Sequence, residues 1–373
     1  MLSIRRLLFV SGALMPLVLL SCDSADEQVG DTLPSPQASA AVAASKAFLF
    51  QPAPAFRVRR DTNTDTPIPP DEPAGANPPD GAVIDYFLAQ PASGPVTVEI
   101  LDAGNQVVRR YSSADRPELR TEQLQKGLIP TYWLREFKSL STAEGMHRWV
   151  WDLHYASPTA TEHEYPIAAI PHDTPRGPLG PTALPAQYRV RLTADGQSLT
   201  TPLTVKMDPR VHTPLAGPRR RFELETRLAS MLSRSSEAVL VANSLREQLK
   251  KLSGQAQGAL KESIQGLDSK LALLLEGPKP APAAGKKEPT LGGVNGEVAA
   301  LYGQAGMADA APNQALLTTA SKAEQDLASL MKRWDEIKSS DIPALNRRLR
   351  EAKLPELRLE ASHDGQDGSA NEE

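Results

Sequence analysis

The hydrophobic pattern of the chain changes its period once, near Asp208-Pro209, and this change restricts the fold more than any other feature. Before this point, short segments such as 95–100 and 188–192 alternate apolar and polar residues, as half-buried strands do. After it, apolar residues recur every three or four positions, as on one face of a helix. The sequence therefore predicts an α+β multidomain protein, with strands first and helices second.

The segment 81–210 is expected to form an antiparallel Ig-like β-sandwich. No helical repeat that would join parallel strands interrupts it, and turn signals such as Ala194-Asp195-Gly196-Gln197 separate the alternating runs. Strands are expected over 82–88, 95–111, 146–153 and 188–207. Two proline-rich loops, about 112–145 and 156–185, are expected between them.

The segment 216–360 is expected to form a helical hairpin or three-helix bundle, with a loop over 277–314. The stripe of the first helix consists of Leu224, Leu228, Met231, Ser235, Ala238, Ala242, Leu245, Leu249 and Leu252. Similar stripes over 260–274 and 316–337 predict the other helices, and Ile342-Pro343 is expected to end the third. Two alternatives stay open for the stripes: packing against one another, or a coiled coil with a partner.

The first 21 residues have the features of a secretory signal peptide. Arg5 and Arg6 precede an apolar run over 7–20, which is shorter than the ~20 residues of a relaxed transmembrane helix. The run ends at Leu19-Leu20-Ser21-Cys22, which resembles the lipobox of bacterial lipoproteins. That resemblance implies cleavage after Ser21 and a diacylglycerol thioether on Cys22, often with a further acyl chain such as palmitate. An ordinary secretory signal followed by a chance cysteine is the alternative.

The lipobox resemblance implies a protein of the bacterial cell envelope, anchored to the inner or outer membrane and facing the periplasm. Two or three acyl chains hold a protein stably on a bilayer. Residues 22–45 are small, polar and unpatterned, which predicts a flexible tether. The proline-rich segment 46–80 carries three phenylalanines and is expected to be an extended arm along the folded part. The acidic tail 361–373 is expected to be disordered.

Net charge and cysteine content exclude several classes of protein. A net charge of −4, from 41 Lys and Arg against 45 Asp and Glu, gives no basic field for nucleic acid. The single cysteine excludes an intramolecular disulfide and a zinc site built from several thiolates. The expected partners are therefore the membrane, through the anchor, and another envelope protein, with a glycan as a further candidate.

Four strings resemble the C-terminal region of bacterial BNR-repeat, sortilin-like propeller proteins, which are often named glycosyl hydrolases. They lie at 77–86, 145–152, 203–210 and 341–346, and the resemblance spans about 46–360. The string Gly145-Met146-His147-Arg148-Trp149-Val150-Trp151-Asp152 is also similar to the Ig-like module of flagellar hook-cap proteins. In the propeller family the propellers precede this region, whereas here a lipobox and a tether precede it and no propeller repeat is visible. The resemblance implies an accessory module to which no catalytic residue is carried over.

Two groups of residues are candidate sites. Glu162, His163-Glu164 and His172-Asp173 can ligate a metal, but their spacing matches no ligand pattern, so no metal or cofactor is expected. Trp133, Trp149 and Trp151 can form a platform on which a sugar ring stacks. The opposing interpretation is that two tryptophans at i and i+2 on a strand belong to the core of a sandwich.

Reactive motifs do not occur in the sequence. It has no Gly-x-Ser-x-Gly, no phosphate-binding glycine loop and no His-Glu-x-x-His. Asp152 follows a predicted strand and is interpreted as an acceptor in a turn, not as a base. The chain is therefore expected not to be an enzyme, but a non-catalytic docking or scaffold module for another envelope protein. The alternative is a carbohydrate-binding or accessory module of a BNR-type glycoside hydrolase system.

Overall fold

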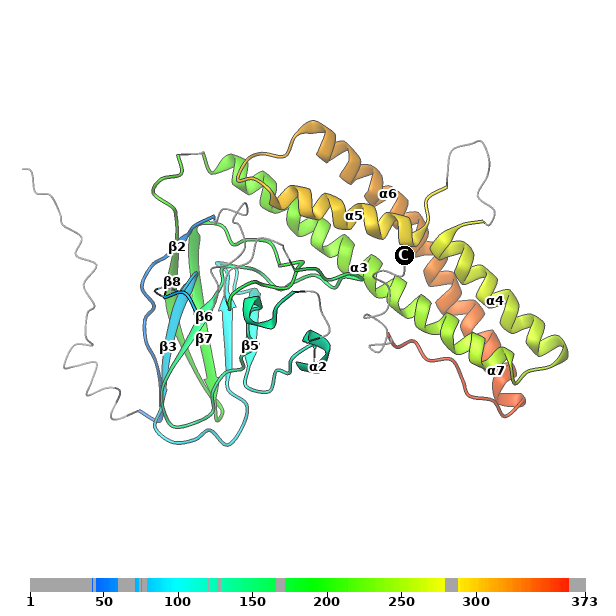
Figure 1. Cartoon of the computed structure of the whole chain (residues 1–373), viewed down its shortest axis with the longest axis horizontal. Coiled ribbons are helices and arrows are strands. Elements are labelled where there is room, and N and C mark those ends of the chain that lie inside the picture. The colour runs from blue at the N-terminus through cyan, green and yellow to red at the C-terminus, as the bar shows by residue number, and fades with distance from the viewer. Residues whose placement is uncertain are drawn as a thin grey trace, which may run out of the picture. The chain divides into compact units, whose positions relative to one another are not determined.

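A computed structural model of the chain describes residues 42, 45–59, 71–73, 75, 79–119, 121–125, 129–165, 172–212, 214–278 and 288–361. The expected signal peptide, Cys22, most of the tether and the tail from 362 lie outside the described residues. The described residues from 45 to 361 belong to one compact unit. Within it, β-sheets precede the long helices along the chain, as the change of period predicts (Figure 1).

The smaller of the two sheets has three antiparallel strands in the order β1-β3-β6. They are β1 (Ala47–Leu49), β3 (Ala82–Leu88) and β6 (Gly145–Trp151). Along β3, buried residues alternate strictly with half-buried ones, because one face of the strand packs on the core. The other face of this sheet points away from the core.

The larger sheet has five strands in the order β2-β8-β7-β4-β5. They are β2 (Ala55–Arg57), β4 (Thr97–Leu101), β5 (Val107–Ser112), β7 (Ala186–Ala194) and β8 (Gln197–Met207). Strands β4, β5, β7 and β8 pair antiparallel, as expected, and the predicted hairpins are β4–β5 and β7–β8. Strand β2 lies outside the segment 81–210 that was expected to be antiparallel, and it pairs parallel with β8. The chain crosses from one sheet to the other between β1 and β2, so β2 is added at the edge without a hairpin turn.

Both sheets contribute to one hydrophobic core. Ile84, Tyr86 and Trp151 from the smaller sheet lie in the same buried cluster as Val98 and Leu203 from the larger one. The indole N–H of Trp151 donates to the carbonyl of His154 at 2.8 Å, so this large aromatic residue is buried without an unpaired polar atom. The arm expected over 46–80 supplies β1 and β2 to these sheets. Two short helices, α2 (Thr121–Leu124) and η1 (Thr131–Trp133), interrupt the expected loop 112–145.

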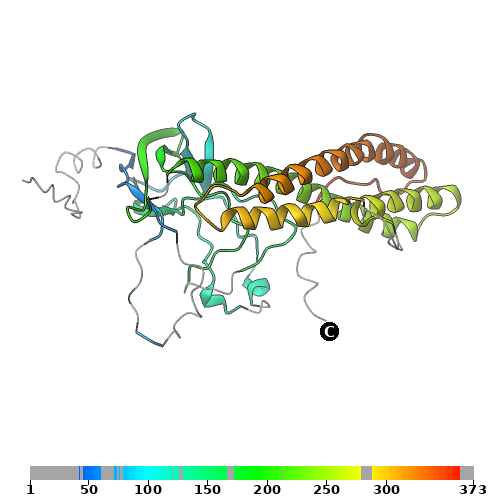
Figure 2. The ribbon, with the colours of Figure 1, turned by 90° about the horizontal axis from the view of Figure 1, so that it is seen from above.

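The second half of the unit is helical. Its elements are α3 (Ala216–Ser253), α4 (Gly258–Glu276), α5 (Leu291–Gly306), α6 (Gln314–Glu336), the π-helical turn η2 (Ile337–Asp341) and α7 (Ile342–Glu351). Helix α3 contacts α4, α5 and α6, and Figure 2 shows α5 and α6 running alongside it. The predicted stripe of α3 is buried in this packing, so it meets other helices of the same chain.

Two boundaries differ from the prediction. The expected loop 277–314 contains α5, which Thr290 caps by accepting a hydrogen bond from the N–H of Gly293. Five glycines lower the helix propensity of α5, but Val294, Val298 and Leu301 bury one face against the other helices. Pro343 does not break the chain's helical course either, because η2 links α6 to α7 and places Pro343 in the first turn of α7.

Polar contacts connect residues between β6 and β7 to the helices. Thr161 donates to the side-chain oxygen of Asn295 on α5 at 2.9 Å, and Asn295 donates to Ser235 and Ser236 on α3 at 2.8 Å each. The hydroxyl of Tyr302 donates to the carbonyl of Leu179 at 2.7 Å. The segments expected to be separate domains, 81–210 and 216–360, are therefore connected by partly buried hydrogen bonds.

Candidate docking surface

The side of the three-stranded sheet that points away from the core carries a row of apolar side chains. Phe48 on β1 lies opposite Phe87 on β3, and Phe87 lies opposite Met146 on β6. Cross-strand neighbours on one face of a sheet are in contact, so these residues form a continuous apolar row across three strands. Met146 has 56% of its surface exposed, so the row is open to solvent at β6.

The neighbouring row contains one aromatic ring and one ion pair. Phe50 follows β1, donates its N–H to the carbonyl of Asp85 at 3.0 Å, and packs edge-to-face on Phe48 with 4.9 Å between ring centroids. The guanidinium of Arg148 donates two hydrogen bonds to the carboxylate of Asp85, from Nε at 2.8 Å and from Nη2 at 2.9 Å. The opposite charges of this pair compensate each other in the middle of the apolar surface.

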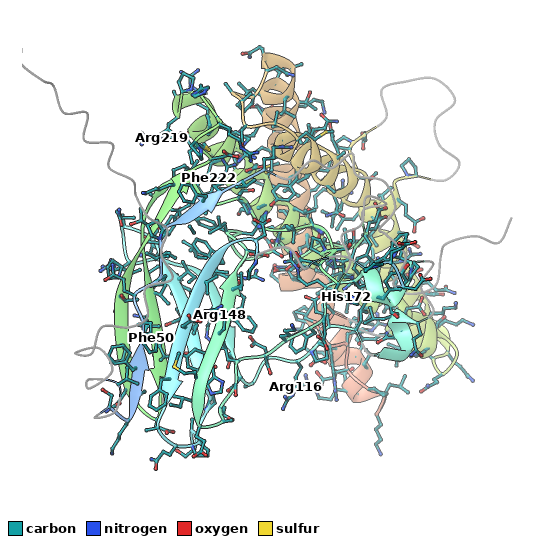
Figure 3. The ribbon with its side chains drawn as sticks, turned by 60° about the vertical axis from the view of Figure 1, so that its left-hand side comes forward. Phe50, Arg116, Arg148, His172, Arg219 and Phe222 are labelled. Carbon is teal, nitrogen blue, oxygen red and sulfur yellow. The ribbon has the colours of Figure 1, made fainter. Side chains whose placement is uncertain are left out.

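A third row pairs Val83 with Val150, and completes the surface. We call this surface the outer face; its members are Phe48, Phe50, Val83, Asp85, Phe87, Met146, Arg148 and Val150. Figure 3 shows Phe50 and Arg148 on this side of the sheet, where no helix of the described chain lies over them. Other large exposed apolar residues are spread over both halves, for example Val107 on β5, Leu273 on α4 and Met307 after α5. An apolar, nearly neutral surface of this kind favours contact with another protein.

The three candidate tryptophans have different environments. Trp151 is fully buried and packs on Tyr188 at 5.3 Å, so it presents no surface to a ligand. Trp149 is half-buried and packs on the ring of Tyr111 at 4.9 Å, and Trp133 in η1 packs edge-to-face on Tyr132 at 6.1 Å. Their indole nitrogens are buried and have no hydrogen-bond partner among the described residues. The three tryptophans therefore do not form the expected platform of exposed rings. Trp151 is enclosed in the core, and Trp149 and Trp133 are each half-buried.

Asp152 accepts hydrogen bonds at the end of β6. The guanidinium of Arg135 donates to it at 2.9 Å and to Asp173 at 2.7 Å, and the N–H of His154 donates to it at 3.2 Å. Burial alone would raise the pKa of Asp152, but the bonds from His154 and the charges of His154, Arg135 and Arg109 hold this pKa well below its usual range. A carboxyl group kept ionised in this way is suited to a turn and unsuited to the role of general acid.

The candidate metal ligands are not brought together. A ring nitrogen of His163 lies 3.0 Å from the carbonyl oxygen of Gly177, and Asp173 is held by Arg135. Within the described ranges, no three His, Cys, Asp or Glu side chains are grouped as a metal site requires.

The outer face was not predicted from the sequence, although a signal was present: β3 has apolar residues at both its inward and its outward positions.

None of the described helices combines the length and the apolarity needed to cross a bilayer. The sequence was also compared with known proteins: no protein-family model matches it, and no curated protein matches it.

Proposed function

We propose that this protein is a lipid-anchored module of the bacterial cell envelope that docks another envelope protein through the outer face. The observation that carries the proposal is the set of three cross-strand rows, with Phe48, Phe87 and Met146 aligned over the whole width of the sheet. Interface cores are rich in aromatic residues and methionine and poor in unpaired charge. The outer face has this composition, because its only charges form the Asp85–Arg148 pair.

The anchor in this proposal is Cys22, the single cysteine of the chain, at the end of the apolar run. Acylation there would hold the folded unit at the inner or outer membrane, facing the periplasm. Replacing Cys22 with Ser should remove the acyl groups from the protein, because the serine hydroxyl cannot form the thioether. Mass spectrometry of the wild-type N-terminal peptide should show the acyl groups, and an unmodified thiol would contradict the anchor without bearing on the docking surface.

The proposed action is binding without reaction. Asp152, which follows the Trp-x-Trp strand, has a lowered pKa, whereas a glycosidase acid needs a raised one.

We also propose that the two sheets form an Ig-like sandwich and that α3 and α4 form a helical hairpin. The shared core, with Trp151 against Tyr188, supports the first, and the short connection between Ser253 and Gly258 supports the second.

Docking can be tested by placing a photo-cross-linking amino acid at Met146 in cells. We expect one discrete cross-linked product with an envelope protein, because Met146 lies in the apolar row and is exposed. The matched control is the same amino acid at Met307, another exposed methionine, which lies at the end of α5. A charged residue at Phe87 should abolish the product at position 146 while the protein remains folded. Equal products at positions 146 and 307, or none at 146, would contradict the outer face as the docking site.

A further inference from the structure

The chain turns back on itself after α7. Lys353 adopts a left-handed conformation, with φ of 57°, and donates its N–H to the carbonyl of Arg350 at 3.0 Å. Leu354 donates to the carbonyl of Leu349 at 2.9 Å, which completes a Schellman motif at the end of the helix. Residues 354–361 then continue in non-helical conformation, and we call them the C-terminal segment.

Two side-chain amides hold the backbone of the C-terminal segment. Asn346 on α7 accepts from the N–H of Leu357 at 2.8 Å and donates to its carbonyl at 3.2 Å. Gln248 on α3 does the same for Arg358, at 2.9 Å and 3.0 Å. In an extended chain, the polar groups of successive residues point to opposite sides. The segment is therefore held from one side by α7 and from the other by α3. Each helix supplies one hydrogen-bond donor and one acceptor, as a neighbouring strand would.

One side chain anchors the segment. Leu357 is 5% exposed and belongs to the hydrophobic cluster of the helices, and Leu354 packs partly against that cluster. Arg358 and Leu359 are exposed, and Glu356 meets Arg350 in an ion pair with both partners largely in solvent. The contacts of the C-terminal segment with the helices thus depend on its backbone and on Leu357 and Leu354. The other side chains of the segment contribute little to these contacts.

We infer that the surface formed by Gln248 of α3, Asn346 of α7 and the apolar residues around Leu357, which we call the groove, is a binding site for an extended peptide, and that the C-terminal segment is its built-in occupant. The partner is a chain segment of the same chemistry: an extended backbone with a leucine at the anchor position and a second leucine three residues before it. Main-chain hydrogen bonds provide the affinity in this kind of recognition, and a pocket for one side chain provides the specificity. The resident segment closes the site until it is displaced. This inference does not rest on the outer face.

A fluorescently labelled peptide with the sequence of residues 353–361 is the probe, and full-length protein is titrated against it by fluorescence anisotropy. We expect Leu357→Asp protein to bind the peptide at least tenfold more tightly than wild type does, because the charged residue leaves the apolar pocket and frees the groove. Leu357→Ala serves as a second variant that keeps the segment uncharged, with a smaller gain expected in the same direction. A peptide carrying Asp at the anchor position should not bind either variant.

The amide contacts provide the control. Adding Gln248→Ala to the Leu357→Asp protein should weaken peptide binding at least fivefold, because the backbone loses the hydrogen bonds from α3. Gln265→Ala, at an exposed glutamine of α4, should leave the affinity unchanged. Equal affinity of wild type and both Leu357 variants would overturn the inference, as would binding that is indifferent to Gln248→Ala.

Discussion

Trp149 and Trp151 lie two residues apart on β6 and have different roles. Trp151 is enclosed by the core of both sheets, whereas Trp149 packs on Tyr111 and is half-buried. We expect Trp151→Ala to lower the free energy of unfolding by ~3–5 kcal/mol, as for a large aromatic residue removed from a core. Urea unfolding followed by circular dichroism measures this change. If Trp151→Ala left the stability unchanged and abolished binding on a glycan array, the carbohydrate-binding alternative would replace the core interpretation.

Asp152 should make the stability of the protein depend on acid. Its pKa is lower in the folded state than the ~3.9 of an unfolded chain, so the unfolded state takes up the proton first. The contribution of Asp152 is therefore present above about pH 5 and is lost as the pH falls through the unfolded value of ~3.9 towards the lower folded value. Asp152→Asn should remove this contribution, about 1–3 kcal/mol near neutral pH, and flatten the loss of stability below pH 5.

The comparison for Asp152 is Asp71→Asn, at an exposed position. Unfolding free energies of wild type and both variants should be measured between pH 3 and 7. Parallel curves for wild type and Asp152→Asn would contradict the assignment of the ionised carboxylate to the turn.

At the scale of elements, α5 is held to α3 by a buried polar side chain. Asn295 is 4% exposed and bonds to Ser235, Ser236 and Thr161 at the same time. We expect Asn295→Ala to leave three hydroxyl groups without this partner and to cost about 2–4 kcal/mol of stability. Chemical denaturation measures the loss. Replacing Ser235 with Ala as well should add less than its own separate cost, because the two changes remove one shared contact.

The strands were predictable because each has one face in the core and one face outside it. That asymmetry appears in the sequence as a period of two, and β3, β4 and β7 lie where it predicts. The long stripe of α3 was predictable for the corresponding reason. Helix α5 was not, because its glycines indicate a loop locally, and only packing against α3 offsets their low propensity.

The outer face and the groove of the C-terminal segment escaped sequence reasoning for a different reason. Both depend on residues that are distant along the chain, such as Phe48 with Met146, or Gln248 with Arg358. Neither pair has a local pattern in the sequence. Conversely, Trp149 and Trp151 had a clear local pattern, but the pattern does not state which ring is enclosed.

At the scale of the whole unit, a buried charged cluster connects the sheets to the helices. Arg57 on β2 bonds to Asp309 at 2.5 Å, Arg221 lies 3.3 Å from the same carboxylate, and Arg221 also meets Glu225 at 3.1 Å. Burial raises the pKa of Glu225 and lowers that of Arg221, in spite of their mutual attraction. Removing Asp309 would leave the buried Arg57 without its carboxylate, and would leave Arg221 paired with Glu225 alone.

We therefore expect Asp309→Ala to destabilise the protein by about 3–5 kcal/mol. The comparison is Glu324→Ala, which removes a more exposed ion pair with Arg227 at 3.8 Å and should change the stability little.

Wild type should unfold in a single transition, with tryptophan fluorescence and helical circular dichroism changing together, since one unit contains both halves. Two separate transitions in the wild type would contradict this coupling.

The cluster around Arg57 also has a practical consequence for anyone who wishes to express part of this chain. The change of period suggests Asp208 as a boundary for cutting the chain. A cut there would separate Arg57 from the carboxylate of Asp309, and Asn295 from Thr161. Fragments cut there should be prone to aggregation, and fusion partners or affinity tags belong outside residues 45–361, where they leave the shared junction whole.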